Sequence, residues 1–117
     1  MHELSIAGAV VDTALRHAED RRVLLVTLRV GQLRQVIPDS LAFYFEIVAR
    51  DTLVEGARLE QIVVPVRMHC DDCAHEWEPE VMFRCPQCEG VGQVLAGDEL
   101  EVDSIEVEED KECIASR

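Results

Sequence analysis

Two pairs of cysteines constrain this 117-residue chain more than any other feature. Two residues lie within each pair and eleven lie between the pairs, so Cys70, Cys73, Cys85 and Cys88 follow the pattern C-x2-C-x11-C-x2-C. A two-residue spacing lets one tight turn present both sulfurs to the same ion, and two such turns complete the tetrahedron that zinc prefers. We therefore predict a four-cysteine zinc site. With all four positions filled, no position remains for water, so the zinc is expected to be structural rather than catalytic.

Other interpretations of these cysteines are weaker but stay open. Iron in a four-sulfur site is chemically possible, whereas a dithiol redox motif would need one pair instead of two matched pairs. His69 and His75 lie beside the first pair and could replace a cysteine ligand or tune the site. The segment 67–92 shows hardly any continuous apolar pattern, so the metal is expected to supply the folding free energy that a core would otherwise provide.

The rest of the sequence predicts a small α+β domain around this segment. Apolar residues at helical spacing predict helices at Leu4–Ala18 and from Pro38 to about Arg50. The apolar stripe expected to be buried on the first helix is Leu4, Ala7, Val11, Ala14, Leu15 and Ala18. Runs of aliphatic and β-branched residues predict strands at Val23–Val30, Leu59–Val66 and Leu100–Val107. The apolar residues of the last strand change phase at Asp103–Ser104, which predicts a bulge or bend there. The expected fold is two helices on a three-stranded sheet, with a zinc-ribbon-like four-cysteine domain inserted between the second and third strands. The predicted limits are 1–66 plus 93–108 for the α/β domain, 67–92 for the inserted zinc domain and 109–117 for an acidic flexible tail.

Charge and composition narrow the possible functions. The chain has 24 acidic and 11 basic residues and a net charge of −13, whereas nucleic-acid binding needs a basic surface. No apolar run approaches the roughly 18 residues of a membrane span, and the first residues lack the pattern of a signal peptide. We expect a cytoplasmic protein without nucleic-acid or membrane partners. We also expect it not to be an enzyme, because the sequence offers no nucleophile-base arrangement and no phosphate-binding loop.

The amino terminus offers a second candidate metal site. The α-amine of Met1 and the backbone and imidazole nitrogens of His2 could close two chelate rings around one ion, with the Glu3 carboxylate beside them. Such nitrogen-rich, near-planar sets suit Ni(II) or Cu(II) better than zinc. A histidine at position 2 is also often an ordinary terminal residue, so the pattern alone does not decide. Weaker candidates for a metal ligand are Asp39, Glu46 and Asp51, although Asp39 beside Pro38 has a simpler explanation as a helix-start residue. His17 is expected to be an ordinary surface residue, and Cys113 in the acidic tail is not expected to be reactive.

Six stretches of the chain, in order from residue 1 to about 108, carry a resemblance to a known family. They are Met1–Ile6, Val30–Leu33, Pro38–Phe45, Glu55–Leu59, the paired cysteines and Glu99–Val107. Together these stretches resemble the HypA/HybF family of hydrogenase nickel incorporation proteins. No single stretch is decisive, but their co-occurrence is highly specific.

The resemblance implies a function and a site for each metal. Met1, His2 and Glu3 would bind the transported Ni(II), and the four cysteines would hold structural Zn(II). The chain would be a nickel metallochaperone that works with a HypB-type GTPase and delivers Ni(II) to the large-subunit precursor of a [NiFe] hydrogenase. We expect a monomer or a weak homodimer. The alternative is a zinc-ribbon adaptor that binds proteins and has no nickel function.

Overall fold

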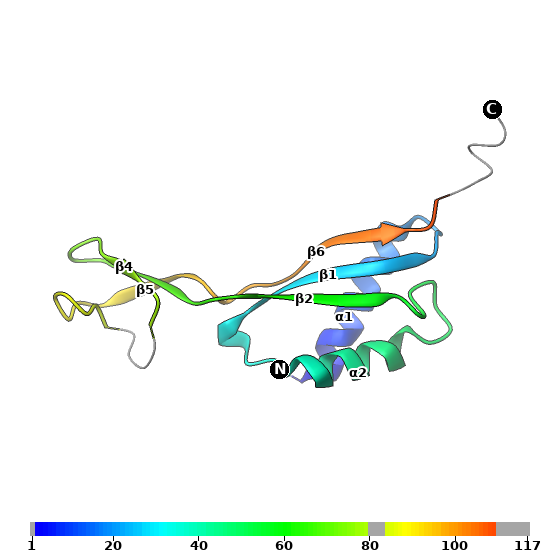
Figure 1. Ribbon diagram of the computed structural model, residues 1–117, viewed down its shortest axis with the longest axis horizontal. Helices are drawn as coiled ribbons and strands as arrows, with labels where there is room; N and C mark the ends of the chain where they lie inside the picture. The colour runs from blue at the N-terminus through cyan, green and yellow to red at the C-terminus, as the bar shows by residue number, and fades with distance from the viewer. Residues whose placement is uncertain (1, 80–83, 110–117) are drawn as a thin grey trace, which may run out of the picture. The chain divides into compact units, whose positions relative to one another are not determined.

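The computed structural model describes residues 2–79 and 84–109, which fold as two compact units (Figure 1). The first unit contains the residues up to Leu28, Val36–Gln61 and the residues from Glu101 onward, and the second contains Arg29–Gln35 and Ile62–Leu100. Within the described part, no helix is both long and apolar enough to cross a bilayer. Met1 and residues 110–117, which include most of the predicted tail and Cys113, lie outside the described residues. The domain limits given above remain a prediction.

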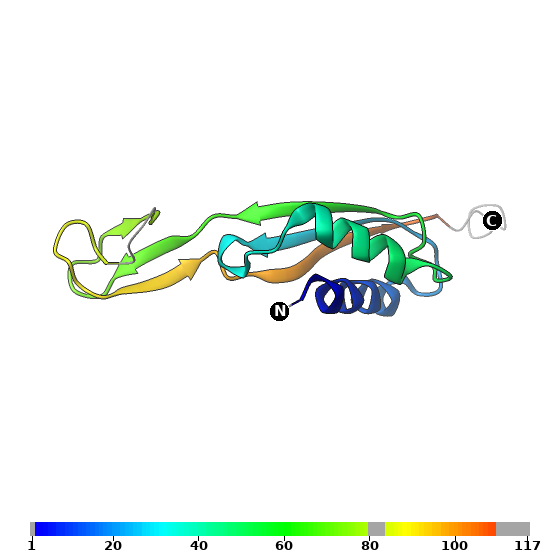
Figure 2. The ribbon, with the colours of Figure 1, turned by 90° about the horizontal axis from the view of Figure 1, so that it is seen from below.

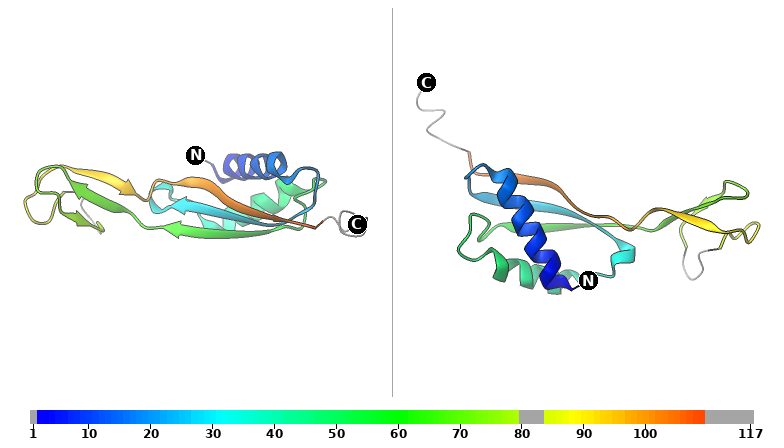
Figure 3. Two further views of the ribbon diagram at one scale, coloured as in Figure 1. Left: turned by 90° about the horizontal axis from the view of Figure 1, so that it is seen from above. Right: turned by 180° about the vertical axis from the view of Figure 1, so that it is seen from behind.

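The first unit has both of its helices on one face of a sheet (Figures 2 and 3). Helix α1 spans Glu3–Ala18 and helix α2 spans Pro38–Ala49. The sheet has the strand order β2-β1-β6, with β1 at Val23–Gly31, β2 at Arg58–Val64 and β6 at Leu100–Val107. Strands β1 and β2 point the same way and β6 runs opposite to them (Figure 1). Because parallel neighbours need a crossover connection, α2 takes this place between β1 and β2. The predicted α+β fold with two helices on a three-stranded sheet is confirmed.

The apolar stripes of the helices explain which faces are buried. In α2, Pro38 occupies the first turn, where its missing N–H costs nothing, and Leu41, Phe45 and Ala49 are buried. In α1 the buried stripe differs from the prediction, because Leu4 is 52% exposed. The buried face is rotated away from Leu4 and toward Ile6 and Val10. The buried residues of α1 are Ile6, Ala7, Val10, Val11, Ala14 and Ala18.

Strand β2 is shorter than predicted, and strand β6 has the predicted length with a change of exposure along it. Strand β2 ends at Val64 and not at Val66 as predicted, since Pro65 has no N–H to donate to a ladder. Strand β6 keeps its predicted bounds, and its exposure changes phase midway. Glu101 and Asp103 are exposed in one phase, and Ser104 and Glu106 are exposed in the other. The change at Asp103–Ser104 is the one that the alternation of apolar residues predicts.

The second unit contains a sheet of its own, with the strand order β4-β3-β5. Strand β3 spans Arg67–Cys70 and pairs antiparallel with β4 (Glu76–Trp77) and with β5 (Gly92–Ala96). Strand β5 was not predicted, and neither was the short 3-10 helix η1 at Gln32–Arg34. Among the described residues of this unit, few apolar side chains are buried, and two of them are cysteines: Val30, Val66, Met68, Cys70 and Cys85.

Two glycines let separate segments of the second unit approach closely. The Gly31 N–H donates to the Glu99 carbonyl at 2.6 Å, and the Leu33 N–H donates to the Gly97 carbonyl at 2.7 Å. A Cβ on Gly31 would collide with the carbonyl group of Gly97. Gly97 itself has a φ of +110°, and a Cβ there would lie 2.6 Å from the Cα of Val66. We call the contact between the segments at Gly31–Leu33 and Gly97–Glu99 the crossing. Neither Gly31 nor Gly97 has room for a Cβ there, and Gly97 also needs the positive φ that glycine adopts readily.

We predict that Gly97→Ala destabilises the protein by about 2–4 kcal/mol, because it combines a left-handed φ with a backbone clash. Urea unfolding monitored by circular dichroism measures the change. Gly8→Ala is the matched control: Gly8 lies within α1, a Cβ there meets nothing within 4 Å, and alanine should stabilise the helix by up to about 1 kcal/mol. Equal stability of the two variants would contradict the role assigned to the crossing.

Candidate metal sites

The structure brings the four predicted cysteine ligands together. The sulfur of Cys88 lies 3.4 Å from that of Cys70 and 3.6 Å from that of Cys73, and Cys73 lies 3.6 Å from Cys85. All four sulfurs lie within 4.8 Å of one another. Zinc–sulfur bonds of about 2.3 Å in a tetrahedron give sulfur–sulfur edges of about 3.8 Å. The cluster therefore has the size and the donor set that a tetrahedral thiophilic metal ion requires.

Both cysteine pairs use the same backbone turn. We call residues Cys70–Ala74 the first knuckle and residues Cys85–Glu89 the second knuckle. In the first knuckle, the Asp72 amide donates to the Cys70 sulfur at 3.4 Å and the Ala74 amide donates to the Cys70 carbonyl at 3.0 Å. In the second knuckle, the Gln87 amide donates to the Cys85 sulfur at 3.4 Å and the Glu89 amide donates to the Cys85 carbonyl at 2.9 Å. The equal spacing in the sequence thus produces two equivalent turns, each with its first sulfur held by a backbone amide.

Each knuckle ends in a residue with a left-handed backbone. The φ angle is 64° at Ala74 and 60° at Glu89, values that cost a residue with a Cβ about 1 kcal/mol relative to glycine. Glycine occurs one residue later, at Gly90, where it serves a different purpose. A Cβ on Gly90 would collide with the Asp72 carboxylate and lie 3.2 Å from the Cys70 sulfur. The second knuckle therefore carries backbone strain at Glu89 and needs the absence of a side chain at Gly90.

The thiols of the metal-free cluster differ widely in acidity. Burial raises the pKa of Cys85, but hydrogen bonds from the Cys88 and Gln87 backbones and the nearby thiols outweigh it and lower the pKa to about 7. The Gly90 backbone lowers the pKa of Cys88, yet the neighbouring sulfurs of Cys70 and Cys73 raise it to about 12. Because the clustered thiols cannot all ionise together at neutral pH, a cation must replace their protons, and metal affinity should fall as the pH falls.

The two histidines beside the first knuckle have other contacts. His69 Nδ1 lies 3.7 Å from a carboxylate oxygen of Glu76, its cross-strand partner, and the His75 ring stacks on Trp77 with centroids 5.9 Å apart. Among the described residues, neither histidine belongs to the cluster of donors within 4.8 Å. Trp77 also lines a hollow together with Cys85 and Pro86, beside the second knuckle.

The structure places two of the three predicted nickel ligands at the start of α1. His2 is the residue that precedes the helix, with φ −86° and ψ 142°, and its carbonyl accepts the first helical hydrogen bond from Ile6. Its exposed side chain makes no capping hydrogen bond. Glu3 follows as the acidic residue of the first turn. Met1, the third predicted ligand, lies outside the described residues.

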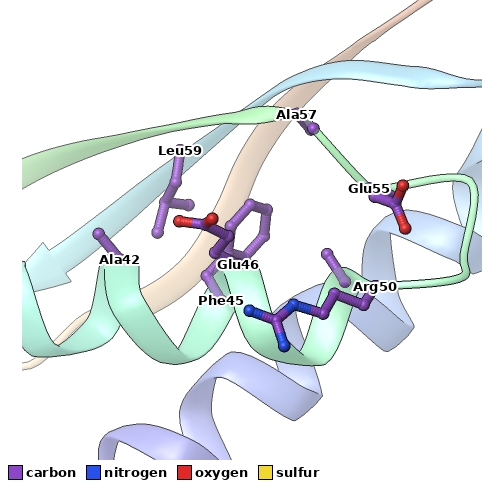
Figure 4. Close-up of a pocket in the computed structure, with 9 residues that line it drawn as sticks. Ala42, Phe45, Glu46, Arg50, Glu55, Ala57 and Leu59 are labelled. Carbon is purple, nitrogen blue, oxygen red and sulfur yellow. The ribbon is translucent and has the colours of Figure 1, made fainter.

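The weaker carboxylate candidates of the first unit lie along α2 and the turn that follows it. Asp39 is in the first helical turn. Glu46 lines a groove of about 720 Å³ between α2 and β2, together with Arg50 and Glu55 (Figure 4). Asp51 has a φ of 63° and donates its amide to the Glu55 carboxylate at 2.7 Å, which is a turn-stabilising contact. In the described part of the chain, none of these carboxylates joins a group of three or more potential ligands within 4.8 Å.

Comparison with known proteins decides the family. A family model described as "Hydrogenase/urease nickel incorporation, metallochaperone, hypA" matches residues 1–107. The chain belongs to the HypA family. The resemblance predicted from the sequence is thereby confirmed, and the match includes both the first helix and the cysteine cluster.

Relatives of the same name cover nearly the whole chain. The "Hydrogenase maturation factor HypA" of Geobacter metallireducens is 46% identical over 110 residues, covering 92% of this chain and all of that protein. The protein of the same name from Streptomyces avermitilis is 40% identical over 116 residues, covering 93% of this chain and 88% of that protein. This HypA chain is thus a nickel-incorporation maturation factor by family.

Solved structures confirm the shared fold. The solution structure of the Ni metallochaperone HypA from Helicobacter pylori matches with a TM-score of 0.67 and 22% identity, covering 92% of this chain and 97% of that one. A second structure, titled "Solution structure of HypA protein", matches with a TM-score of 0.71 and 23% identity over the same shares. At this level of identity the likeness concerns the fold alone.

The strain at the second knuckle yields a prediction about metal affinity. Glu89→Gly should tighten zinc binding by two- to fivefold, about 0.5–1 kcal/mol, because glycine adopts the left-handed φ without a steric penalty. Gly90→Ala, one residue further along the chain, should weaken binding because its Cβ would press on Asp72 and the Cys70 sulfur. Competition for zinc against a chromogenic chelator measures both variants. Unchanged or weaker zinc affinity in Glu89→Gly would contradict the inference that the backbone at Glu89 is strained.

Proposed function

We propose that this HypA chain binds Ni(II) at its amino terminus and delivers it to the [NiFe] hydrogenase large subunit. We also propose that the four cysteines bind one structural zinc ion. The proposed nickel ligands are the α-amine of Met1, the backbone and imidazole nitrogens of His2, and the carboxylate of Glu3. The observation that carries the proposal is the family match, which begins at residue 1 and describes nickel incorporation. The alternative of an adaptor without nickel function has no comparable support.

The setting of His2 supports this assignment. A residue that precedes a helix commonly uses its side chain to cap the free amides of the first turn. His2 makes no such bond, and its exposed imidazole remains available to a metal ion. Glu3 is half-buried in the first turn, where its carboxylate interacts favourably with the positive end of the helix dipole. A cation between these two side chains would be bound next to solvent, as exchange with a partner requires.

The choice of zinc for the cysteines rests on the chemistry of the donor set. Four thiolates favour zinc over harder ions, and a closed tetrahedron leaves no open coordination position. With four thiolates and one zinc ion, the site carries a net charge of −2. Backbone amides that donate to the sulfurs of Cys70 and Cys85 offset part of this charge.

Nickel titrations test the terminal site. We predict that His2→Ala and a chain with one residue added before Met1 each bind Ni(II) more than tenfold more weakly than the native chain, a loss of at least about 1.4 kcal/mol. Calorimetry on protein purified without an N-terminal tag measures the affinity. The matched control is His17→Ala, which removes an exposed histidine at the opposite end of α1 and should leave nickel binding unchanged.

The same titration has a definite pH dependence. The imidazole and the amine must lose their protons to bind the ion, so nickel affinity should fall as the pH is lowered. The zinc content of each variant, measured by atomic absorption, should stay at one equivalent. Unchanged nickel affinity in both His2→Ala and the extended chain would overturn the terminal site and favour the adaptor function.

Delivery is tested separately with a partner GTPase of the HypB type. We propose that ligands of the partner displace Glu3 first and His2 second, because a terminal site can exchange its ligands stepwise. Nickel should therefore reach the partner faster than it dissociates spontaneously into a chelator. Stopped-flow absorbance of the Ni(II) complex gives both rates. Equal rates would exclude direct transfer while leaving nickel binding itself intact.

A further inference from the structure

The four cysteines fall into two classes by their exposure. Cys70 and Cys85, the first residue of each knuckle, are buried, with relative exposures of 0% and 1%. Cys73 and Cys88, the second residue of each knuckle, are exposed. Because the two knuckles use the same turn, the exposed sulfurs come from equivalent positions on different knuckles. A small reagent in solution therefore meets the sulfurs of Cys73 and Cys88 first.

The two exposed sulfurs are also neighbours. They lie 3.6 Å apart, although their residues are separated by fifteen positions in the sequence. The buried Cys70 sulfur lies even closer to Cys88, at 3.4 Å, and it accepts amide hydrogen bonds from both Asp72 and Cys73. Backbone amides of His75 and Gly90 also bond to Cys73 and Cys88, so hydrogen bonding does not distinguish the sulfurs. Cys70 differs because it is fully buried and therefore out of reach of a peroxide in solution. Cys73 and Cys88 are therefore the two cysteines that are both exposed and close to each other.

From this arrangement we propose that Cys73 and Cys88 form an oxidation site, at which hydrogen peroxide converts the two exposed thiolates into a disulfide that links the knuckles and opens the metal site. One exposed thiolate attacks an oxygen of hydrogen peroxide, the O–O bond breaks, and a cysteine sulfenic acid and hydroxide result. The hydroxide takes up a proton and becomes water. The second thiolate then attacks the sulfenic sulfur and displaces hydroxide, which takes up a proton. Two thiolates thereby lose two electrons in total, and the peroxide, with two protons, becomes two water molecules.

The oxidised cluster keeps only Cys70 and Cys85 as thiolate ligands. Two thiolates do not complete the tetrahedron that structural zinc requires, so the metal should leave the site. The second unit has few buried apolar residues, so loss of the metal should also loosen this unit. The inference rests on the proposal that zinc fills the four cysteines, and the zinc content before oxidation tests that proposal by itself.

Disulfide mapping of the zinc-loaded full chain is the direct test. The chain carries Cys113→Ser, so that every disulfide must come from the four cluster cysteines. After treatment with hydrogen peroxide, the protease Asp-N cuts before Asp71 and Asp72 and separates Cys70 from Cys73. Trypsin cuts after Arg84 and separates Cys73 from the peptide that holds Cys85 and Cys88. Tandem mass spectrometry distinguishes Cys85 from Cys88 within the linked peptide. A chromogenic chelator records zinc release in the same sample.

We expect free cluster thiols to fall from four to two, one zinc ion to be released for each disulfide, and the Cys73–Cys88 linkage to predominate. A dithiol reductant with added zinc should restore the starting state. Predominance of Cys70–Cys88 or Cys70–Cys73 would overturn the pairing. Retention of zinc and of all four thiols in excess peroxide would overturn the oxidation site.

Alkylation gives a second measurement that needs no disulfide. In the untreated, zinc-loaded protein, iodoacetamide should label Cys73 and Cys88 before Cys70 and Cys85, because only the first two sulfurs are exposed. The order of labelling follows from peptide mass spectrometry at increasing times. Equal labelling of all four cysteines would contradict the division into an exposed and a buried pair.

Discussion

The second unit depends on the convergence of four sulfur atoms. Thiolates repel one another when they are brought within 3.4–3.6 Å, and the sulfurs of Cys70 and Cys73 accordingly raise the pKa of Cys88. The unit has too few buried apolar residues to hold two knuckles together against it. A divalent cation between the sulfurs would offset this repulsion, because it attracts each of the four thiolates. The positions of β3, β4 and β5 all follow from this centre, since β3 ends at Cys70 and β5 pairs with β3.

The first unit depends on a different kind of constraint, the burial of one apolar face. Helices α1 and α2 cover one side of the β2-β1-β6 sheet, with small residues such as Ala7, Ala14 and Ala49 at the buried positions. Such small side chains let two helices pack closely on a short sheet. This unit needs no metal for its core. Metal loss should therefore affect the two units unequally, with the second unit losing more structure.

Much of the fold and part of the site could be predicted from the sequence. Helix α2 and strand β6 follow from clear periodicity, and the cysteine spacing predicts a cluster whose sulfurs do converge. Strand β5 was missed because Gly92–Ala96 has weak apolar alternation and pairs only through distant Arg67–Cys70. The burial of Leu4 was wrong because periodicity identifies the apolar stripe of a helix but not the neighbour that it contacts. The cluster thiols differ in pKa and in exposure. These differences depend on nearby backbone amides and on burial, which the spacing of the cysteines does not predict.

The position of His2 at the start of a helix has an electrostatic consequence for any bound cation. The free amides of the first turn carry partial positive charge, equivalent to roughly half an elementary charge. This charge opposes a divalent ion, and the Glu3 carboxylate compensates for it only in part. At the proposed nickel site, the imidazole donor would thus lie where the helix end opposes the charge of the bound ion. If the chain delivers nickel as proposed, this opposing charge would favour release of the ion to a partner.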